Sequence, residues 1–97
     1  MRKIKFSSDA LIEAANCLKV LSNPTRLQIV QLLCEKSRSV GEIADECAIP
    51  HNLASTHLKI LERCRFLKSH RKGRSVQYDV IEKHLFDLLR CIEKRFS

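Results

Sequence analysis

The 97-residue chain contains no tryptophan, two glycines, two prolines and five aromatic residues, so few residues break helices or fill large aromatic clusters. Such a scarcity of breakers favours a mainly helical fold. No apolar run approaches the roughly 20 residues that a membrane-spanning helix requires, so we expect no membrane partner. Residues 1–8 lack the apolar segment of a secretory signal, and we therefore expect a cytoplasmic protein.

The sequence also lacks the motifs that would indicate an enzyme. It has no glycine-rich phosphate loop, no nucleophile elbow and no paired carboxylates that would fall into one cleft. A chain of this length forms one domain, here residues 1–97, with little left over to build a substrate pocket. We expect a protein that is not an enzyme and that carries no cofactor.

Acidic residues are absent between positions 63 and 74, and this gap concentrates the positive charge. The chain has 18 Lys and Arg against 11 Asp and Glu, for a net charge of +7. Six cations fall in the gap: Arg63, Arg65, Lys68, Arg71, Lys72 and Arg74. A local basic patch of this kind indicates a phosphate-bearing partner. The alternative is a charged loop that only faces solvent.

Helical spacing of apolar residues predicts two helices in the first third of the chain, at about 9–21 and 24–35. Asn23 followed by Pro24 is a typical helix start, with a capping side chain and then proline in the first turn. The second helix is apolar around most of its circumference, so we expect it to lie at the centre of the core.

Two shorter helices and a hairpin follow. Ser39 and Glu42 form a capping-box pattern, which predicts a third helix with Val40, Ile43, Ala44 and Cys47 on its buried side. Pro50 marks a turn, and a fourth helix is expected at about 51–63, with Leu53, Ala54, Leu58 and Leu61 facing inward. Asn52, Ser55, Thr56, Lys59 and Arg63 then remain on its outer face.

From Phe66 onward the apolar period changes from 3.6 to 2, as in a strand. Val76, Tyr78 and Val80 alternate with polar residues, and residues 66–70 are the expected partner strand. The four residues 71–74 would form the turn, with Gly73 supplying a positive φ. A last helix is predicted at about 82–96, with more apolar surface than one small core needs, which favours dimerisation through the first and last helices.

The order of two short helices and a basic hairpin suits a winged helix-turn-helix, a mainly α fold with a small β-hairpin. In such a fold the second of the two helices enters the DNA major groove and the hairpin holds phosphates. We therefore predict double-stranded DNA as the partner. The candidate DNA-binding residues are His51, Asn52, Ser55, Thr56, Lys59, Arg63, Arg71, Lys72 and Arg74.

Four segments in this order resemble the ArsR/SmtB family of winged-helix repressors. They are Leu18-Lys19-Val20-Leu21-Ser22-Asn23-Pro24-Thr25-Arg26-Leu27, Ser39-Val40-Gly41-Glu42-Ile43, Ser55-Thr56-His57-Leu58-Lys59-Ile60-Leu61 and Gly73-Arg74-Ser75-Val76-Gln77-Tyr78. The resemblance implies a homodimeric repressor that reads an imperfect palindrome and leaves DNA when an inducer binds. The sequence departs from the family pattern at two positions. Pro50 stands at the usual serine that starts the fourth helix, and Arg65 at the usual glycine after it, where a left-handed conformation is expected.

The resemblance also defines where a metal inducer would bind, and each implied site is incomplete in this chain. Val40 and Gly41 stand where the third-helix site has cysteines, and Cys64 has Ile60 in place of its partner cysteine. Glu82 and His84 match the early half of a last-helix zinc site, but Arg95 stands at the late histidine. Because closed zinc sites need four ligands, we predict no metal site. His57 is expected to be a packed or phosphate-contacting residue.

Five cysteines at wide spacings are expected to be free thiols. Inert core residues are one reading. The other is a redox switch, for which Cys91 leads, with Cys34 on the second helix and Cys17, which could approach Cys91 across a dimer interface. A different alternative for the whole chain is a winged-helix docking module in a larger assembly, although a docking surface more often exposes aromatic residues.

Overall fold

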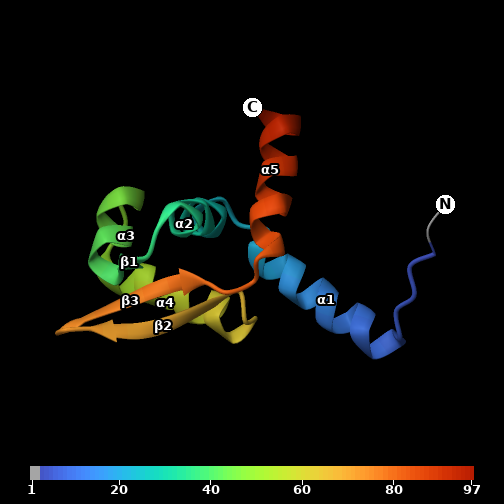
Figure 1. Cartoon of the computed structure of the whole chain (residues 1–97), viewed down its shortest axis with the longest axis horizontal. Helices are drawn as coiled ribbons and strands as arrows, with labels where there is room; N and C mark the ends of the chain where they lie inside the picture. The colour runs from blue at the N-terminus through green and yellow to red at the C-terminus, as the bar shows by residue number, and fades with distance from the viewer. Residues whose placement is uncertain (1–2) are drawn as a thin grey trace.

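The computed structural model describes residues 3–97 and begins with two helices in the predicted places (Figure 1). α1 spans Ser8–Leu21, and the Ser7 hydroxyl accepts a hydrogen bond from the Ala10 amide at 3.1 Å. α2 spans Pro24–Glu35, and the Asn23 side chain accepts from the Arg26 amide at 3.0 Å. The Asn-Pro start is therefore confirmed, because its side chain satisfies an amide that the first helical turn leaves free.

α3 (Val40–Cys47) and α4 (His51–Arg63) form the predicted pair of helices. The capping box at the start of α3 is confirmed: the Ser39 hydroxyl accepts from the Glu42 amide at 3.1 Å, and the Glu42 carboxylate accepts from the Ser39 amide at 2.9 Å. Ala48 ends α3 in the left-handed region at φ 53°. That turn redirects the chain within three residues, so α4 can pack across α3.

A three-stranded antiparallel sheet follows, in the order β1-β3-β2. β2 is Leu67–Lys72 and β3 is Ser75–Val80, paired from Leu67 opposite Val80 to Lys72 opposite Ser75. The prediction for the turn was wrong, because Arg71 and Lys72 extend β2 and only residues 73–74 connect the strands. β1, Arg38–Ser39, pairs with β3 and was not predicted, since two residues are too few to display an alternating pattern.

α5 spans His84–Phe96 and starts two residues later than the apolar spacing suggested. The Glu82 carboxylate accepts a hydrogen bond from the His84 amide at 3.1 Å, so Glu82 lies just before the helix and satisfies an amide of its first turn. Lys83, which occupies the N-cap position, contributes no capping hydrogen bond from its side chain.

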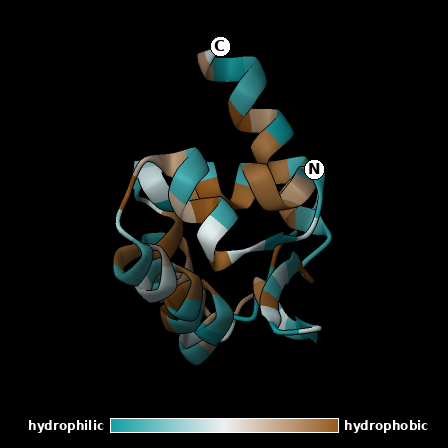
Figure 2. Ribbon diagram, turned by 90° about the vertical axis from the view of Figure 1, so that its left-hand side faces the viewer, coloured by the Kyte–Doolittle hydropathy of each residue, from teal (hydrophilic) through white to brown (hydrophobic). Residues whose placement is uncertain are grey.

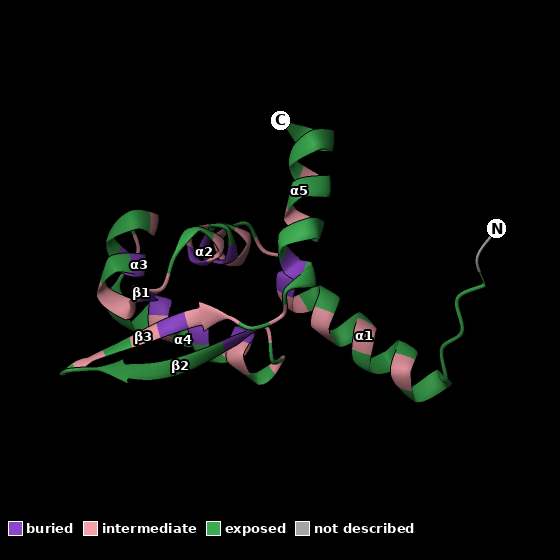
Figure 3. Ribbon diagram, viewed as in Figure 1, coloured by how far each residue is buried: buried purple, intermediate pink, exposed green. Residues whose placement is uncertain are grey.

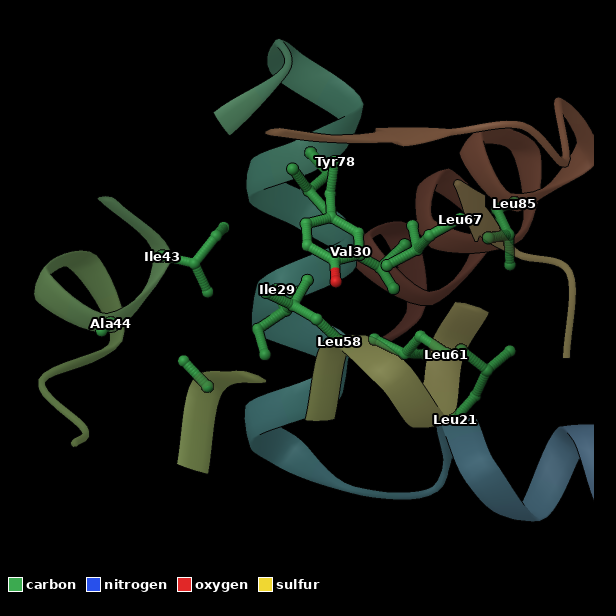
Figure 4. Close-up of a cluster of buried hydrophobic side chains, with 12 residues drawn as sticks. Leu21, Ile29, Val30, Ile43, Ala44, Leu58, Leu61, Leu67, Tyr78 and Leu85 are labelled. Atoms are coloured by element: carbon green, nitrogen blue, oxygen red, sulfur yellow. The ribbon is translucent and has the colours of Figure 1, made fainter. Parts of the chain in front are cut away.

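The core lies where α2, α3, α4 and the sheet meet (Figure 4). Ile29 and Val30 of α2 are fully buried, as are Ile43 of α3 and Leu58 and Leu61 of α4. Each such side chain contributes roughly 1.5–3 kcal/mol relative to an exposed position. The expected central position of α2 is thus confirmed. Its expected apolar circumference is not, because Gln28, Gln31 and Glu35 line an exposed side.

α1 and α5 extend away from this core (Figure 1), which gives the molecule extents of 48 × 31 × 20 Å. Most of α1 and the outer part of α5 are exposed (Figure 3), although α5 carries hydrophobic bands along its length (Figure 2). The large apolar side chains exposed on these two helices are Leu11, Ile12, Leu18, Phe86, Leu88 and Phe96. Within residues 3–97 no helix has both the length and the apolar character needed to cross a bilayer.

Candidate nucleic-acid interface

α4 presents a polar face to solvent, and the residues that were predicted to read DNA lie on it. Asn52, Thr56, Lys59 and Arg63 are all exposed, at helical spacing along one side. The Thr56 hydroxyl donates to the Asn52 backbone carbonyl at 3.0 Å, so the Thr56 side chain is held against its own helix. Ser55 is half-buried at the margin of this face. The predicted outer face of the helix is therefore confirmed, with Ser55 as its least accessible member.

The helix starts without a side-chain cap, as the proline at position 50 suggested. Pro50 contributes no capping hydrogen bond from its side chain, and its carbonyl accepts from the Leu53 and Ala54 amides at 3.1 and 3.0 Å. Amides ahead of these in the first turn have no partner within the helix. His51 is exposed in this turn, where an anionic group could approach the helix end.

Leu53 contradicts its predicted inward position. Its side chain is 41% exposed, whereas Ala54, Leu58 and Leu61 are fully buried. These three residues recur at intervals of four and three, which defines the inward side of α4. Leu53 lies one residue before this series, about 100° around the helix, and therefore falls on its flank.

The hairpin β2–β3 forms the wing, and the acid-free stretch runs from the end of α4 into it. All six cations of the acid-free stretch are exposed: Arg63, Arg65, Lys68, Arg71, Lys72 and Arg74. None of them belongs to an ion pair within the part of the chain that the structure describes. Gly73 adopts φ 64° at the tip, as predicted. The wing and the end of α4 together therefore offer six cationic groups to an external anion, and none of the six is paired with a carboxylate in the described residues.

Arg65, which follows α4, adopts φ 60°, so the expected left-handed conformation is confirmed. Its amide donates to the Glu62 carbonyl at 2.9 Å, and the Phe66 amide donates to Leu61 at 3.2 Å, which closes the helix and starts the wing. A residue other than glycine pays a steric cost for this conformation.

Hydrogen bonds that were not predicted from the sequence connect the wing to α4. The Glu62 carboxylate accepts from both the Ser69 amide at 3.2 Å and the Ser69 hydroxyl at 3.0 Å. Asp79 similarly holds His70 across the two wing strands, with 2.8 Å between Oδ2 and Nδ1. The residues in these contacts are seven or nine positions apart in the sequence, so no local pattern predicts them.

Two predicted DNA-binding residues from different elements meet near the start of α3. His51 of α4 and Arg74 of the wing border a shallow hollow of about 340 Å³, whose floor includes Ser39, Val40 and Gly41. Val76 also lines it and is 38% exposed, because it lies beyond the part of β3 that the helices cover. The other two residues of the predicted apolar face of this strand are better covered: Tyr78 is buried and Val80 is half-buried.

His57 is packed inside the domain, as predicted. Its Nδ1 accepts a hydrogen bond from Arg26 Nε at 3.0 Å, and Arg26 also donates to the Val20 carbonyl at 3.2 Å. Burial, and secondarily the positive charge of Arg26, lowers the pKa of His57 below its ordinary value. The neutral imidazole thus joins α4 to Arg26 near the start of α2, and the same Arg26 side chain connects α2 to the end of α1.

Within one chain the three candidate sensor thiols lie on different helices; an approach of Cys17 to Cys91 across a dimer interface stays a prediction. Cys91 is exposed on α5, Cys34 borders a groove of about 540 Å³ between α2 and α5, and Cys17 lies half-buried on α1. The structure instead places the Cys17 thiol beside Cys64, which was predicted only as a residual metal half-site. Glu82 and His84 lie next to each other before and at the start of α5. Within residues 3–97 no three potential ligands among His, Cys, Asp and Glu are grouped to hold a metal ion.

Comparison with known proteins defines the family. The model of the bacterial regulatory protein, arsR family, matches residues 23–69, from the start of α2 into the wing. The uncharacterised HTH-type transcriptional regulator MJ1325 of Methanocaldococcus jannaschii is 30% identical over 83 residues, which are 84% of this chain and 93% of that protein. The chain belongs to the ArsR family.

Other ArsR-family relatives agree in sequence and in fold. The HTH-type transcriptional repressor SmtB of Mycobacterium tuberculosis strain H37Rv is 38% identical over 77 residues. The aligned region is 79% of this chain, which spans about 57% of the length of SmtB. The homodimeric winged helix-turn-helix DNA-binding domain of Mb0332 from Mycobacterium bovis superposes with a TM-score of 0.79 at 26% identity, over 96% of this chain and 87% of that one. The fold is thus a winged helix-turn-helix, and its relatives are regulators of transcription.

Proposed function

We propose that this ArsR-family chain is a transcriptional repressor that binds an imperfect palindrome in double-stranded DNA as a homodimer. The observation that carries the proposal is the juxtaposition of a polar, exposed α4 with a wing whose cations have no internal partners. SmtB, with 38% identity, is named a transcriptional repressor. Mb0332 is described as a homodimeric DNA-binding domain.

In this proposal α4 enters the major groove. Asn52 and Lys59 point to the same side of the helix as Thr56, and the groove is wide enough to admit a helix. An asparagine amide can pair with adenine through two hydrogen bonds, and a lysine can donate to guanine. His51 lies in the first turn of α4 and Ser55 at the margin of its exposed face, so both would also approach the base edges.

The wing and Arg63 supply phosphate contacts. Arg71, Lys72 and Arg74 lie on the exposed hairpin outside α4, so they would follow the sugar-phosphate backbone beside the groove. Such contacts contribute affinity and position the protein, whereas base contacts discriminate sequence. They also make binding depend steeply on salt, because each neutralised phosphate releases counterions.

The dimer would form through α1 and α5. Both helices leave the core and expose large apolar side chains, including Leu11 and Ile12 on α1 and Phe86 and Leu88 on α5. A monomer that exposed this much apolar surface in water would gain free energy by covering it with a second copy. Two-fold symmetry would then set the two copies of α4 about one DNA turn apart, which matches a palindromic operator.

The alternative of a docking module is less well supported. The surface that a docking partner would use in place of DNA consists of α4 and the wing, and it is polar and cationic. Of the four phenylalanines and the one tyrosine, Tyr78 is buried and Phe66 is half-buried. The remaining three are Phe6, near the start of the described chain, and Phe86 and Phe96 on α5. The aromatic side chains therefore lie away from this surface.

The test is a fluorescence-anisotropy titration against the DNA upstream of the protein's own gene and against a scrambled duplex, at two salt concentrations. We expect tighter binding to the native duplex. Lys59→Ala should reduce the preference for it, with a loss of about 1–3 kcal/mol on that sequence alone. Arg71→Ala should weaken binding to both duplexes and reduce the salt slope by about 1.8 per dimer, which is about 0.9 for each of two phosphates.

A matched control is Glu93→Gln on α5, which changes a charge away from α4 and the wing. Equal, weak binding to both duplexes, with an Arg71→Ala salt slope like that of the wild type, would contradict the proposal. A monomeric mass at micromolar concentration in analytical ultracentrifugation would contradict its dimeric part.

A further inference from the structure

Two cysteines from distant parts of the sequence meet where α1 packs on α4. Leu21 and Leu61 belong to the same buried cluster and lie side by side in the close-up of the core (Figure 4). Cys17 precedes Leu21 by one turn of α1, and Cys64 follows Leu61 by about one turn at the C-cap of α4. Because α1 and α4 pack on each other here, Cys17 and Cys64 are neighbours, and the Cys17 thiol affects the ionisation of Cys64.

The pair is partly exposed, and it is separate from the other thiols. Cys17 and Cys64 are both half-buried, so neither residue is enclosed in the core. Cys34 lies in the groove between α2 and α5, and Cys47 on the far side of the domain on α3. Cys91 is exposed on α5. A thiol–thiol contact therefore distinguishes Cys17 and Cys64 from the three residues that serve as internal controls.

We propose that Cys17 and Cys64 form an intrachain disulfide when the protein meets a small-molecule disulfide, with glutathione disulfide as the representative oxidant. The bond would join α1, which carries an exposed apolar face, to the end of α4, the helix with the exposed polar face. Because the two helices already pack against each other, closing the bond requires adjustment of two side chains and the C-cap and leaves the core in place.

The reaction consists of two thiol–disulfide exchanges. The Cys17 thiolate attacks one sulfur of glutathione disulfide, the S–S bond of the oxidant breaks, and one glutathione thiolate leaves. Cys64 then gives its proton to solvent, and its sulfur attacks the Cys17 sulfur of the mixed disulfide, which expels the second glutathione thiolate. Two protein thiols are oxidised, and one small disulfide is reduced to two thiols.

The surroundings of Cys64 indicate that it reacts in the second of the two exchanges. Burial and the neighbouring Cys17 thiol raise the pKa of Cys64 to about 11, against an opposing effect of the Arg26 guanidinium. Cys64 is therefore protonated at neutral pH and is a slow nucleophile toward a bimolecular oxidant. Once Cys17 carries the mixed disulfide, the attack by Cys64 becomes intramolecular, and proximity compensates for the small thiolate fraction.

The experiment exposes the reduced full-length chain to 1 mM glutathione disulfide, alkylates the remaining thiols and maps the tryptic peptides without reduction. Trypsin separates Cys17, in residues 6–19, from Cys64, in residues 64–65. We expect these two peptides to be linked, in a species at least about tenfold more abundant than the mixed disulfide at either residue. Cys17→Ser and Cys64→Ser should each abolish the link, whereas Cys47→Ser and Cys91→Ser should leave it unchanged.

Other products would overturn the proposal. If glutathione accumulates on Cys17 while Cys64 stays alkylated, the two sulfur atoms cannot reach bonding distance. If the principal product is a covalent dimer joined through Cys91, the reactive thiol is the exposed one on α5. Circular dichroism of the serine variants, compared with the wild type, establishes that the loss of the link does not reflect a loss of fold.

Discussion

Mild acid should destabilise this domain through one buried histidine. His57 accepts a hydrogen bond at Nδ1 from Arg26 Nε over 3.0 Å, and its residue is only 9% exposed. Protonation at Nδ1 would remove that acceptor and set a second positive charge beside the guanidinium. Burial, followed by the charge of Arg26, therefore holds the pKa of His57 below its ordinary 6.5.

The sign of the effect follows from proton binding. Below pH 6.5 the unfolded chain takes up a proton at His57, and the folded chain does not until the pH reaches its lower folded-state pKa. The contribution to stability is thus complete above pH 6.5 and is lost as the pH falls toward the folded-state pKa. Within that window each pH unit removes up to about 1.4 kcal/mol per protomer from the free energy of unfolding.

Urea unfolding followed by circular dichroism, at one protein concentration and at pH 7.5, 6.5 and 5.5, measures this loss. These three pH values lie above the ordinary glutamate pKa of 4.5. Hydrogen bonds to Ser39 lower the pKa of Glu42 further, so that carboxylate stays ionised throughout. His57→Asn retains an acceptor for Arg26 and cannot be protonated, and it should flatten the pH dependence. His51→Asn, at an exposed position on the same helix, should not. Equal acid losses in the wild type and in His57→Asn would refute the argument.

Three further predictions concern packing, backbone strain and thiol chemistry. Leu61→Ala should lower the free energy of unfolding by about 2–5 kcal/mol, because Leu61 is fully buried, whereas Leu53→Ala at an exposed position should cost less than about 1 kcal/mol; urea titration distinguishes them. Arg65→Gly should raise stability by about 1 kcal/mol, since glycine removes the steric cost at φ 60°, and a lower urea midpoint would disprove this. Closure of the Cys17–Cys64 disulfide from the mixed disulfide should accelerate about tenfold per unit between pH 7 and 10, because the Cys64 pKa is about 11, and acid-quenched mass spectrometry follows the rate.

Local signals in the sequence were sufficient for the helices and for the family. The Asn23-Pro24 start and the Ser39/Glu42 capping box act within three residues, so the side chains that form them are adjacent in the sequence as well as in space. The outer face of α4 followed from helical spacing alone, because burial of Ala54, Leu58 and Leu61 fixes which residues are left for solvent. The cationic stretch from 63 to 74 was visible as an absence of acids.

The features that were predicted wrongly or not at all depend on contacts between elements that are distant in the sequence. Leu53 was assigned to the core by its residue type, but no neighbouring element covers the flank of α4 on which it lies. β1 exists because β3 offers hydrogen bonds to Arg38 and Ser39, and two residues carry no periodicity of their own. The turn of the wing was predicted to begin two residues too early, at position 71, because the pairing of Lys72 with Ser75 depends on the register between two strands.

The helix boundaries near caps, the charged wing and the resemblance to the ArsR family could be read from the sequence, since these depend on residues close together in the chain. The contacts between distant side chains became visible only in the folded molecule. Glu62 holds Ser69, Arg26 holds His57 across 31 positions, and Cys17 neighbours Cys64. Contacts of this kind are set by how helices pack around a shared core, and packing depends on the shapes of all the elements together and not on any one segment.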